Sequence, residues 1–257
     1  MANKYRRARK KRRKWWPYLV SFFLLAVLGA GIGAYLAKPS LFSDLQFWKA
    51  KKTVVTTPSS SKKKVEKSDL PAVSTKDWQL ILVNRDNVKP ELNPQLTDVD
   101  AIKVDSRIVD PTRQFLEAAR KIAPEETLIS GYRSVAEQTE LYNERVAELE
   151  ASGLSHEEAE KQVQTQVQVP GASEHQTGLA IDMSVEAGQS DELGLQLAAI
   201  APQYGFVLRY PDGKSNITGV NFENWHFRYV GVESAQYMTK HQLVLEEYIQ
   251  LLKKAGK

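Results

Sequence analysis

Residues 173–182, with the sequence SEHQTGLAID, decide how the chain folds. The first half of this stretch is a polar loop that carries His175. The second half, from Leu179, is an apolar run of the length expected for a buried strand. One carboxylate, Asp182, interrupts that run. Because desolvating an ionised carboxylate costs several kcal/mol, we expect Asp182 either to be paired or to bind a metal ion.

A second stretch, ENWHFRYV at residues 223–230, carries another histidine inside an aromatic segment. We expect a strand from Trp225 to Val230, with His226 in it. Side chains alternate between the two faces of a strand, so His226 and Glu223, an odd number apart, would face opposite ways. The spacing therefore predicts that Glu223 lies in the turn before the strand.

Taken singly, these residues have structural explanations. Asp182 could accept hydrogen bonds from the backbone or from an arginine, and His226 could be a core histidine. Together, His175, Asp182 and His226 supply two imidazoles and one carboxylate, which leave one tetrahedral position on zinc open for water. Glu223 is then a spare carboxylate, and metal-assisted hydrolysis needs one to take the proton of the attacking water and pass it to the leaving amine.

The surrounding sequence predicts an ordinary globular domain from about residue 76 to residue 257. Two capping boxes, Ser134 with Glu137 and Ser155 with Glu158, begin helices, and Gly153 ends the first of them. Strands are expected at 78–83, 127–130, 179–185, 206–210 and 225–230, and further helices at 111–122, 191–204 and 234–254. Strands and helices that do not alternate regularly favour an α+β fold with a small antiparallel sheet flanked by helices.

Three motifs resemble one enzyme family. They are Ser130-Gly-Tyr-Arg-Ser134 with Gln138, then Ser173-x-His-x-x-Gly-x-Ala-x-Asp182, then Glu223-x-Trp-His-x-Arg-Tyr229. The residues of these motifs and their order along the chain are similar to those of the zinc D-alanyl-D-alanine carboxypeptidases of the VanY type, and most of all to those of the L,D-carboxypeptidase (LdcB-type) branch. The resemblance extends from about residue 76 to the C-terminus, and no ligand position departs from it.

The resemblance implies roles for nine residues. The zinc ligands would be His175, Asp182 and His226, with Glu223 as general base and acid. Arg133 would bind the terminal carboxylate of the substrate or the oxyanion that develops on the scissile carbonyl. The pocket around the D-residues would be lined by Gln138, Ser173, Tyr210 and Trp225. Three of these four also have a purely structural explanation: Trp225 in the core, Tyr210 at a strand end and Gln138 on a helix surface.

Composition limits the alternatives. The 257 residues include no cysteine, which excludes disulfides, thiolate metal sites and a cysteine nucleophile. Residues 1–67 hold 17 of the 35 basic residues and 2 of the 31 acidic ones, so the remainder has a net charge of −11. Nucleic-acid binding by the folded part is therefore not expected. His156 and His241 fall on polar parts of expected helices and are interpreted as surface residues.

The N-terminal third predicts a membrane anchor. Residues 1–14 form a basic tail, and residues 15–37 are uncharged, which as a helix gives about 34 Å, enough to cross a bilayer core. The basic cluster predicts a cytoplasmic N-terminus with everything after Lys38 outside. A cleavable signal peptide is the alternative, although its apolar region is usually shorter. Residues 38–75 contain few large apolar residues after Trp48 and are interpreted as a flexible stalk.

The combined hypothesis is a monomeric, membrane-anchored zinc carboxypeptidase that removes the terminal D-alanine from peptidoglycan stem peptides outside the cell. Its leading form is an L,D-carboxypeptidase acting on tetrapeptides. The alternatives are a D,D-carboxypeptidase acting on pentapeptides and a non-catalytic wall-binding module on the same fold. A third class, in which the basic N-terminus binds nucleic acid, conflicts with its position beside an apolar span. Residues 144–168 are expected to form a solvated helical hairpin, with a lid over the site as a further possibility.

Overall fold

The computed structural model describes residues 69–257. The predicted tail, the predicted span and most of the predicted stalk lie outside these residues. Within them, no helix combines the length and apolarity that crossing a membrane requires. Residues 70–75 belong to the folded part, because Leu70 and Val73 pack on the core and Thr75 Oγ1 donates to the carbonyl oxygen of Lys257 (3.0 Å). Residues 70–75, which were expected to belong to the stalk, therefore pack on the folded domain.

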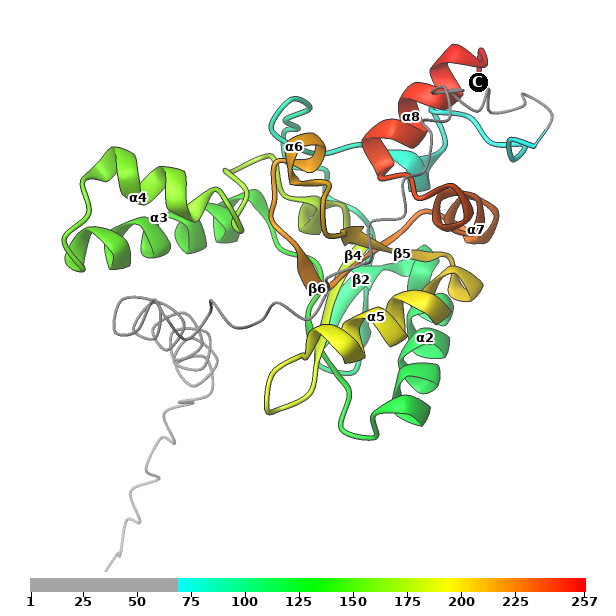
Figure 1. Ribbon diagram of the computed structural model, residues 1–257, viewed down its shortest axis with the longest axis horizontal. Helices are drawn as coiled ribbons and strands as arrows, with labels where there is room; N and C mark the ends of the chain where they lie inside the picture. Colours follow the sequence, from blue (N-terminus) through cyan, green and yellow to red (C-terminus); the bar gives the residue numbers. More distant parts are fainter. Residues whose placement is uncertain (1–68) are drawn as a thin grey trace, which may run out of the picture. The chain divides into compact units, whose positions relative to one another are not determined.

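A four-stranded antiparallel sheet in the order β3-β4-β6-β5 forms the centre of the domain (Figure 1). Its strands are β3 (Thr127–Ser130), β4 (Ala180–Ser184), β5 (Phe206–Tyr210) and β6 (Glu223–Tyr229). A separate hairpin of β1 (Leu96–Val99) and β2 (Ile102–Asp105) was not expected from the sequence. The expected α+β class with an antiparallel sheet is confirmed.

Seven α-helices and four short 3₁₀ turns surround the sheets in the described residues. The helices are α2 (Val109–Ile122), α3 (Val135–Ala151), α4 (His156–Val163), α5 (Asp191–Ile200), α6 (Ser215–Thr218), α7 (Val232–His241) and α8 (Leu245–Lys254). The 3₁₀ turns are η2 (Trp78–Leu80), η3 (Ser106–Ile108), η4 (Glu174–Thr177) and η5 (Ala201–Tyr204). Both predicted capping boxes are present at the starts of α3 and α4.

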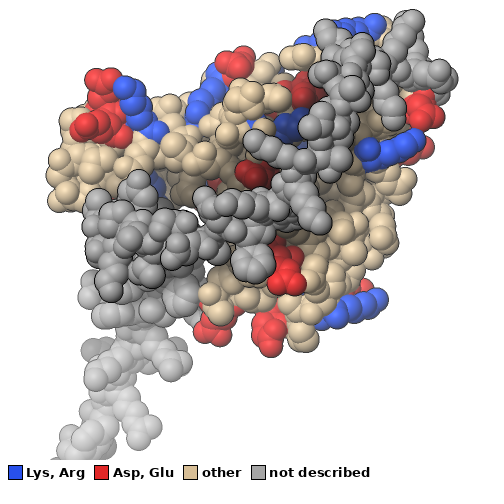
Figure 2. All heavy atoms as spheres, in the orientation of Figure 1, with Lys and Arg blue, Asp and Glu red and all other residues tan. Residues whose placement is uncertain are grey.

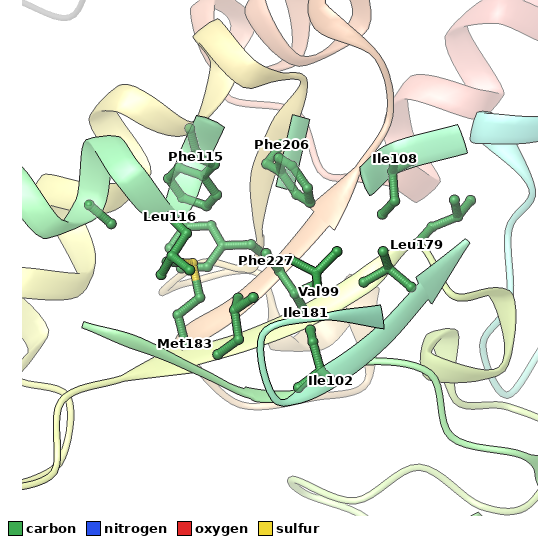
Figure 3. Packing of buried hydrophobic residues seen from close by; sticks show 14 of the residues in the cluster. Val99, Ile102, Ile108, Phe115, Leu116, Leu179, Ile181, Met183, Phe206 and Phe227 are labelled. Atoms are coloured by element: carbon green, nitrogen blue, oxygen red, sulfur yellow. The ribbon is translucent and has the colours of Figure 1, made fainter. Parts of the chain in front are cut away.

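The main core lies between one face of the sheet, the β1–β2 hairpin and the helices α2 and α5. Phe115 of α2 stacks on Phe206 of β5 and meets the edge of Phe227 of β6, while Ile181 and Met183 of β4 pack beside them (Figure 3). A second apolar cluster joins α7 and α8 to the other face. Alternate residues of each strand therefore serve the main core, and the residues between them are free to face the site.

The hairpin of α3 and α4 extends away from the sheet (Figure 1). It has its own small apolar cluster, which includes Tyr142, Val146, Ala159 and Val163. The expected helical hairpin is confirmed, and a role as a lid stays a prediction. Around the domain, basic and acidic side chains of the described residues are interspersed on the face shown in Figure 2.

Two expected elements are wrong. Residues 78–83 form the turn η2 and an irregular segment instead of a strand, because Arg228 Nη2 donates to the carbonyl oxygens of Gln79 (3.0 Å) and Ile81 (2.8 Å). The closing helix is broken into α7 and α8 at Gln242, which has a left-handed φ of 53°. That break turns α8 so that Glu246 reaches the domain interior.

Candidate metal centre and catalytic site

The three expected metal ligands meet on the face of the sheet opposite the main core. Asp182 of β4 is directly opposite His226 of β6 in the antiparallel register, so both side chains project from the same face. His226 Nδ1 lies 3.0 Å from Asp182 Oδ1, and His175 Nε2 of η4 lies 3.4 Å from Asp182 Oδ2. One ligand atom from each residue lies within 4.8 Å of the others, a grouping that can hold one metal ion.

The loop before β4 fixes the direction of His175. Its Nδ1 is 2.6 Å from the carbonyl oxygen of Gly131, which leaves Nε2 directed at the site. Ser173 caps η4 by accepting a hydrogen bond from the His175 backbone N–H (3.4 Å). Gly178 ends the turn with a φ of 67°, and a Cβ there would lie 2.7 Å from the backbone nitrogen of Asp105. Only glycine fits at this position without displacing the β2 end.

His226 is oriented from the opposite direction. Its Nδ1 faces Asp182, and its Nε2 faces Glu174 Oε2 at 3.7 Å. Each histidine therefore presents one nitrogen to the same point and directs the other to an oxygen acceptor. This arrangement is the usual one for metal-binding imidazoles, because the outer acceptor fixes the tautomer and the ring plane.

The donor set fits zinc. Two imidazole nitrogens and one carboxylate are ligands that zinc prefers, and three protein ligands are typical of a catalytic site. Asp182 Oδ1 is buried and accepts no hydrogen bond, so it has an electron pair available for a cation. A buried acceptor without a partner is costly, and a bound cation removes that cost.

Glu223 lies beside this group, but its position in the chain differs from the expectation. It is the first residue of β6 rather than part of the preceding turn. The pairing of β5 with β6 is irregular here, since Leu208 is opposite Phe227 while Tyr210 is opposite Glu223. The additional residues of β6 change the alternation of faces, as a bulge does, and Glu223 Oε2 comes within 3.8 Å of His226 Nδ1.

Burial and neighbouring charges perturb the acid–base behaviour of all four groups. Burial raises the pKa of Glu223 to about 8 and lowers that of His175 to about 3. Burial alone would raise the pKa of Asp182, but the neighbouring His175, His226 and Arg133 outweigh this effect and lower the pKa to about 2. For His226, burial alone would lower the pKa, but the nearby carboxylates of Asp182 and Glu174 raise it to about 9. Such clustering of shifts is typical of functional sites.

The structure places Arg133 near the same point. Its backbone N–H donates to the carbonyl oxygen of His175 (3.2 Å), and its buried Nε has no partner. Burial lowers the pKa of Arg133, while the charges of Asp182 and Glu223 act in the opposite direction. An arginine fork with an unused donor beside the metal group can bind an anionic part of a substrate.

Of the four expected pocket residues, Tyr210 is the best placed. Its buried ring lies 4.9 Å from the ring of His226, centroid to centroid. Ser173 has the structural role of capping η4, and Gln138 Nε2 donates to the carbonyl oxygen of Gln168 (2.5 Å) while its Oε1 has no partner. Trp225 is adjacent to His226 in β6 and partly exposed. Their contact with a substrate stays a prediction.

The other two histidines lie away from this group. His156 is exposed, and its Nδ1 is 2.8 Å from Glu150 Oε1, as expected for a surface residue. His241 is partly buried, with its ring 4.3 Å from that of Tyr237, so it is less solvated than expected.

Sequence reasoning missed the buried charges behind His226. Glu174 Oε1 accepts hydrogen bonds from Arg209 Nε (2.8 Å) and Arg228 Nη1 (2.8 Å), and Arg209 also donates twice to Glu246 (2.6 and 2.9 Å). The two arginines hold the pKa of Glu174 well below its usual range, against the effect of burial. The signal was available, because Arg209 and Arg228 interrupt apolar strands as Asp182 does.

A family model described as VanY, D-alanyl-D-alanine carboxypeptidase, matches residues 101–232, a range that contains all three ligand positions and Glu223. The chain belongs to the VanY family. A D-alanyl-D-alanine carboxypeptidase of Enterococcus faecalis is 39% identical to it over 177 residues, which cover 67% of this chain and 66% of the relative. The expected resemblance to the VanY family is confirmed.

Solved VanY structures share the fold. One, a mutant of the vancomycin resistance D,D-pentapeptidase VanY in complex with Zn(II), is 38% identical with a TM-score of 0.63 and covers 67% of this chain and 99% of its own. Another, VanYB in complex with D-alanine-D-alanine, matches equally well (38%, TM-score 0.63, 68% and 98%). The LdcB LD-carboxypeptidase is 31% identical with a TM-score of 0.56, covering 66% and 84%. The folded domain is therefore a zinc peptidase domain of the VanY family.

Proposed function

We propose that this protein is a peptidoglycan carboxypeptidase that removes the terminal D-alanine from stem peptides. The observation that carries the proposal is the meeting of His175, Asp182 and His226 with a fourth acidic residue, Glu223, that remains outside the ligand group. A wall-binding module would need the metal for stability alone and would have no use for the spare carboxyl group.

The residues would divide the work as follows. His175, Asp182 and His226 would hold zinc, which when bound polarises the scissile carbonyl and lowers the pKa of water. Glu223 would accept the proton of the attacking water and return it to the leaving amine, so that the proton count balances. Arg133 would bind the negative charge of the terminal carboxylate or of the developing oxyanion.

The D,D bond is the first candidate for the cleaved bond. The E. faecalis relative and the VanY structures are named for D-alanyl-D-alanine or D,D activity, and they match at higher identity than LdcB does. The L,D activity expected from the motifs is the second candidate, supported by the LdcB match over nearly the same share of the chain. VanYB binds D-alanine-D-alanine, which supports a short peptide with a free carboxylate as the ligand.

We also propose that residues 15–37 anchor the protein in the cytoplasmic membrane with the zinc domain outside and residues 1–14 inside. The support is the uncharged run beside the basic cluster, together with the location of peptidoglycan outside the membrane. Membrane fractionation of cells, followed by protease treatment of spheroplasts, tests this topology. Resistance of the zinc domain to external protease would contradict it.

The activity is tested by digesting purified tetrapeptide and pentapeptide muropeptides and weighing the products. Loss of one alanine from the pentapeptide alone identifies D,D activity, and loss from the tetrapeptide alone identifies L,D activity. Glu223→Gln should retain zinc and fold while turnover falls at least about a hundredfold, because proton transfer contributes roughly 10²–10⁴ to rate. If neither muropeptide is shortened, the proposal fails; an unchanged rate in the variant removes Glu223 from the mechanism.

A further inference from the structure

A chain of buried charges connects the zinc ligand His226 to the C-terminal helix α8. Glu174 Oε2 faces His226 Nε2 at 3.7 Å, and Glu174 Oε1 accepts from Arg209 Nε at 2.8 Å. Arg209 then forms a two-pronged ion pair with Glu246 of α8 at 2.6 and 2.9 Å. Asn84 Nδ2 donates to Glu246 Oε1 (2.9 Å), which ties the N-terminal segment of the domain to the same point.

Stability alone is a weak reason for this arrangement. Glu174, Arg209 and Arg228 are essentially inaccessible to solvent, and Glu246 is 7% exposed. Removing four charges from water costs more than their attraction commonly repays, and apolar residues of similar volume often stabilise a core equally well. The hydrogen bonds among these charges do fix the positions of the groups that they join, because each hydrogen bond has a preferred geometry.

The end of the network at His226 is incomplete. Glu174 Oε2 and His226 Nε2 are both buried, neither has any other hydrogen-bond partner, and they face each other. Their separation exceeds a hydrogen bond by only a few tenths of an ångström, and catalytic hydrogen bonds are often long before a site is loaded. A proton on Nε2 satisfies both atoms and leaves Nδ1, which faces Asp182, unprotonated for a metal ion.

We propose that Glu174 is a positioning residue that holds His226 in the tautomer with a protonated Nε2, and that Arg209 and Glu246 hold Glu174 in place from α8. This inference rests on the zinc site of the proposed function and deepens it. Zinc affinity should therefore depend on a helix that supplies no ligand. The two histidines would be oriented by different acceptors, a backbone carbonyl for His175 and a carboxylate anchored by two arginines for His226.

Zinc affinity of the full-length variants, measured by chelator competition, tests the proposal without any peptidoglycan. Glu174→Gln should weaken zinc binding about 10- to 100-fold, as expected for the loss of an outer partner of a ligating histidine. Glu246→Gln leaves Glu174 intact and should weaken zinc binding by at least about threefold, because the effect of the substitution reaches Glu174 through Arg209. The matched control is Leu252→Ala, a fully buried α8 residue outside the network, which should lower the melting temperature and leave zinc affinity within about twofold.

Histidine ¹⁵N NMR of the zinc-loaded protein supplies the second readout. The proposal expects His226 to carry its proton on Nε2, and expects that proton to exchange faster in Glu246→Gln. Protonation on Nδ1, wild-type zinc affinity in Glu174→Gln, or equal weakening by Leu252→Ala and Glu246→Gln would each overturn it. If Glu174→Gln does not fold, the comparison of zinc affinity between Glu246→Gln and Leu252→Ala decides. A protein that shows these effects yet shortens no muropeptide would refute the proposed function and leave this inference standing.

Discussion

Replacing Gly178 by alanine should disturb the zinc site through the loop that carries His175. Gly178 has a φ of 67°, and an added Cβ would lie 2.7 Å from the backbone nitrogen of Asp105. That nitrogen donates to the carbonyl oxygen of Gly178 itself (2.9 Å), so the two segments cannot separate without losing this bond. The substitution combines backbone strain with a clash against rigid main chain.

The magnitude follows from the two contributions. A left-handed conformation costs an alanine about 1–2 kcal/mol, and a clash in a packed region costs about 1–3 kcal/mol more. Gly213 is the matched control, because its φ is 75° and a Cβ there meets nothing within 4 Å. Gly213→Ala should lower the melting temperature through backbone strain alone. Gly178→Ala should melt roughly 3–10 °C below Gly213→Ala, because each kcal/mol of additional destabilisation lowers the melting temperature by about 2–4 °C for a domain of this size.

Differential scanning calorimetry of both full-length variants, with and without chelator, measures this difference. Gly178→Ala should also bind zinc more weakly, because His175 is three residues away on the same turn, whereas Gly213→Ala should bind as wild type does. Equal melting temperatures for the two variants would refute the clash. A Gly178→Ala protein with wild-type zinc affinity would show that the turn does not position His175.

Three further outcomes are expected. Glu126 is buried, and its carboxylate oxygens have no hydrogen-bond partner. Burial raises its pKa to about 7, so the native state keeps a proton that the unfolded state loses above about pH 4.5. The free energy of unfolding should therefore fall as the pH rises from about 4.5 to 7. Glu126→Gln should abolish this pH dependence and raise the free energy of unfolding at pH 8 by about 1–2 kcal/mol after allowance for solvent screening. Urea denaturation of both proteins across this pH range measures the effect, and the same pH dependence in the variant and the wild type would refute it. Chelation of zinc should lower the melting temperature yet leave circular dichroism native-like, because neither of the two larger apolar clusters contains an expected metal ligand; complete unfolding on chelation would contradict this. Asp182→Asn should abolish tight zinc binding in a folded protein, and stoichiometric zinc in the purified variant would remove Asp182 from the ligand set.

Local chemistry made much of the fold predictable. Both capping boxes place their serine and glutamate three residues apart, and each begins a helix where expected. Gly205, with a φ of 81°, ends the segment after α5, although Pro202 lies in a last turn that tightens to 3₁₀ geometry. These elements depend on neighbours within one turn, so their sequence is sufficient to specify them.

The errors arose where distant groups decide the backbone. The apolar alternation at 78–83 is typical of a strand, but the carbonyl oxygens there accept hydrogen bonds from Arg228, far away in the chain. The break at Gln242 involves no glycine or proline, and its consequence, an inward Glu246, depends on Arg209 of another strand. No local pattern contains that information.

The expected metal ligands were easier to predict from the sequence than the residues that hold them in place. Asp182 and His226 each stood out because a polar group interrupts an apolar strand, and they are neighbours across the β4–β6 register. The position of Glu223 was derived from ideal alternation, which fails where β6 carries additional residues opposite β5. Glu174 escaped notice because it occurs in a polar loop, where a glutamate is ordinarily solvated.

The central claim is that His175, Asp182 and His226 bind one zinc ion while Glu223 stays unbound beside it. Anomalous diffraction at the zinc edge, from crystals of the zinc-loaded protein, tests this most directly. We expect a single strong peak about 2.0–2.2 Å from His175 Nε2, an Asp182 oxygen and His226 Nδ1, with the Glu223 carboxylate beyond bonding distance. A peak elsewhere, or one bonded to Glu223 in place of Asp182, would contradict it.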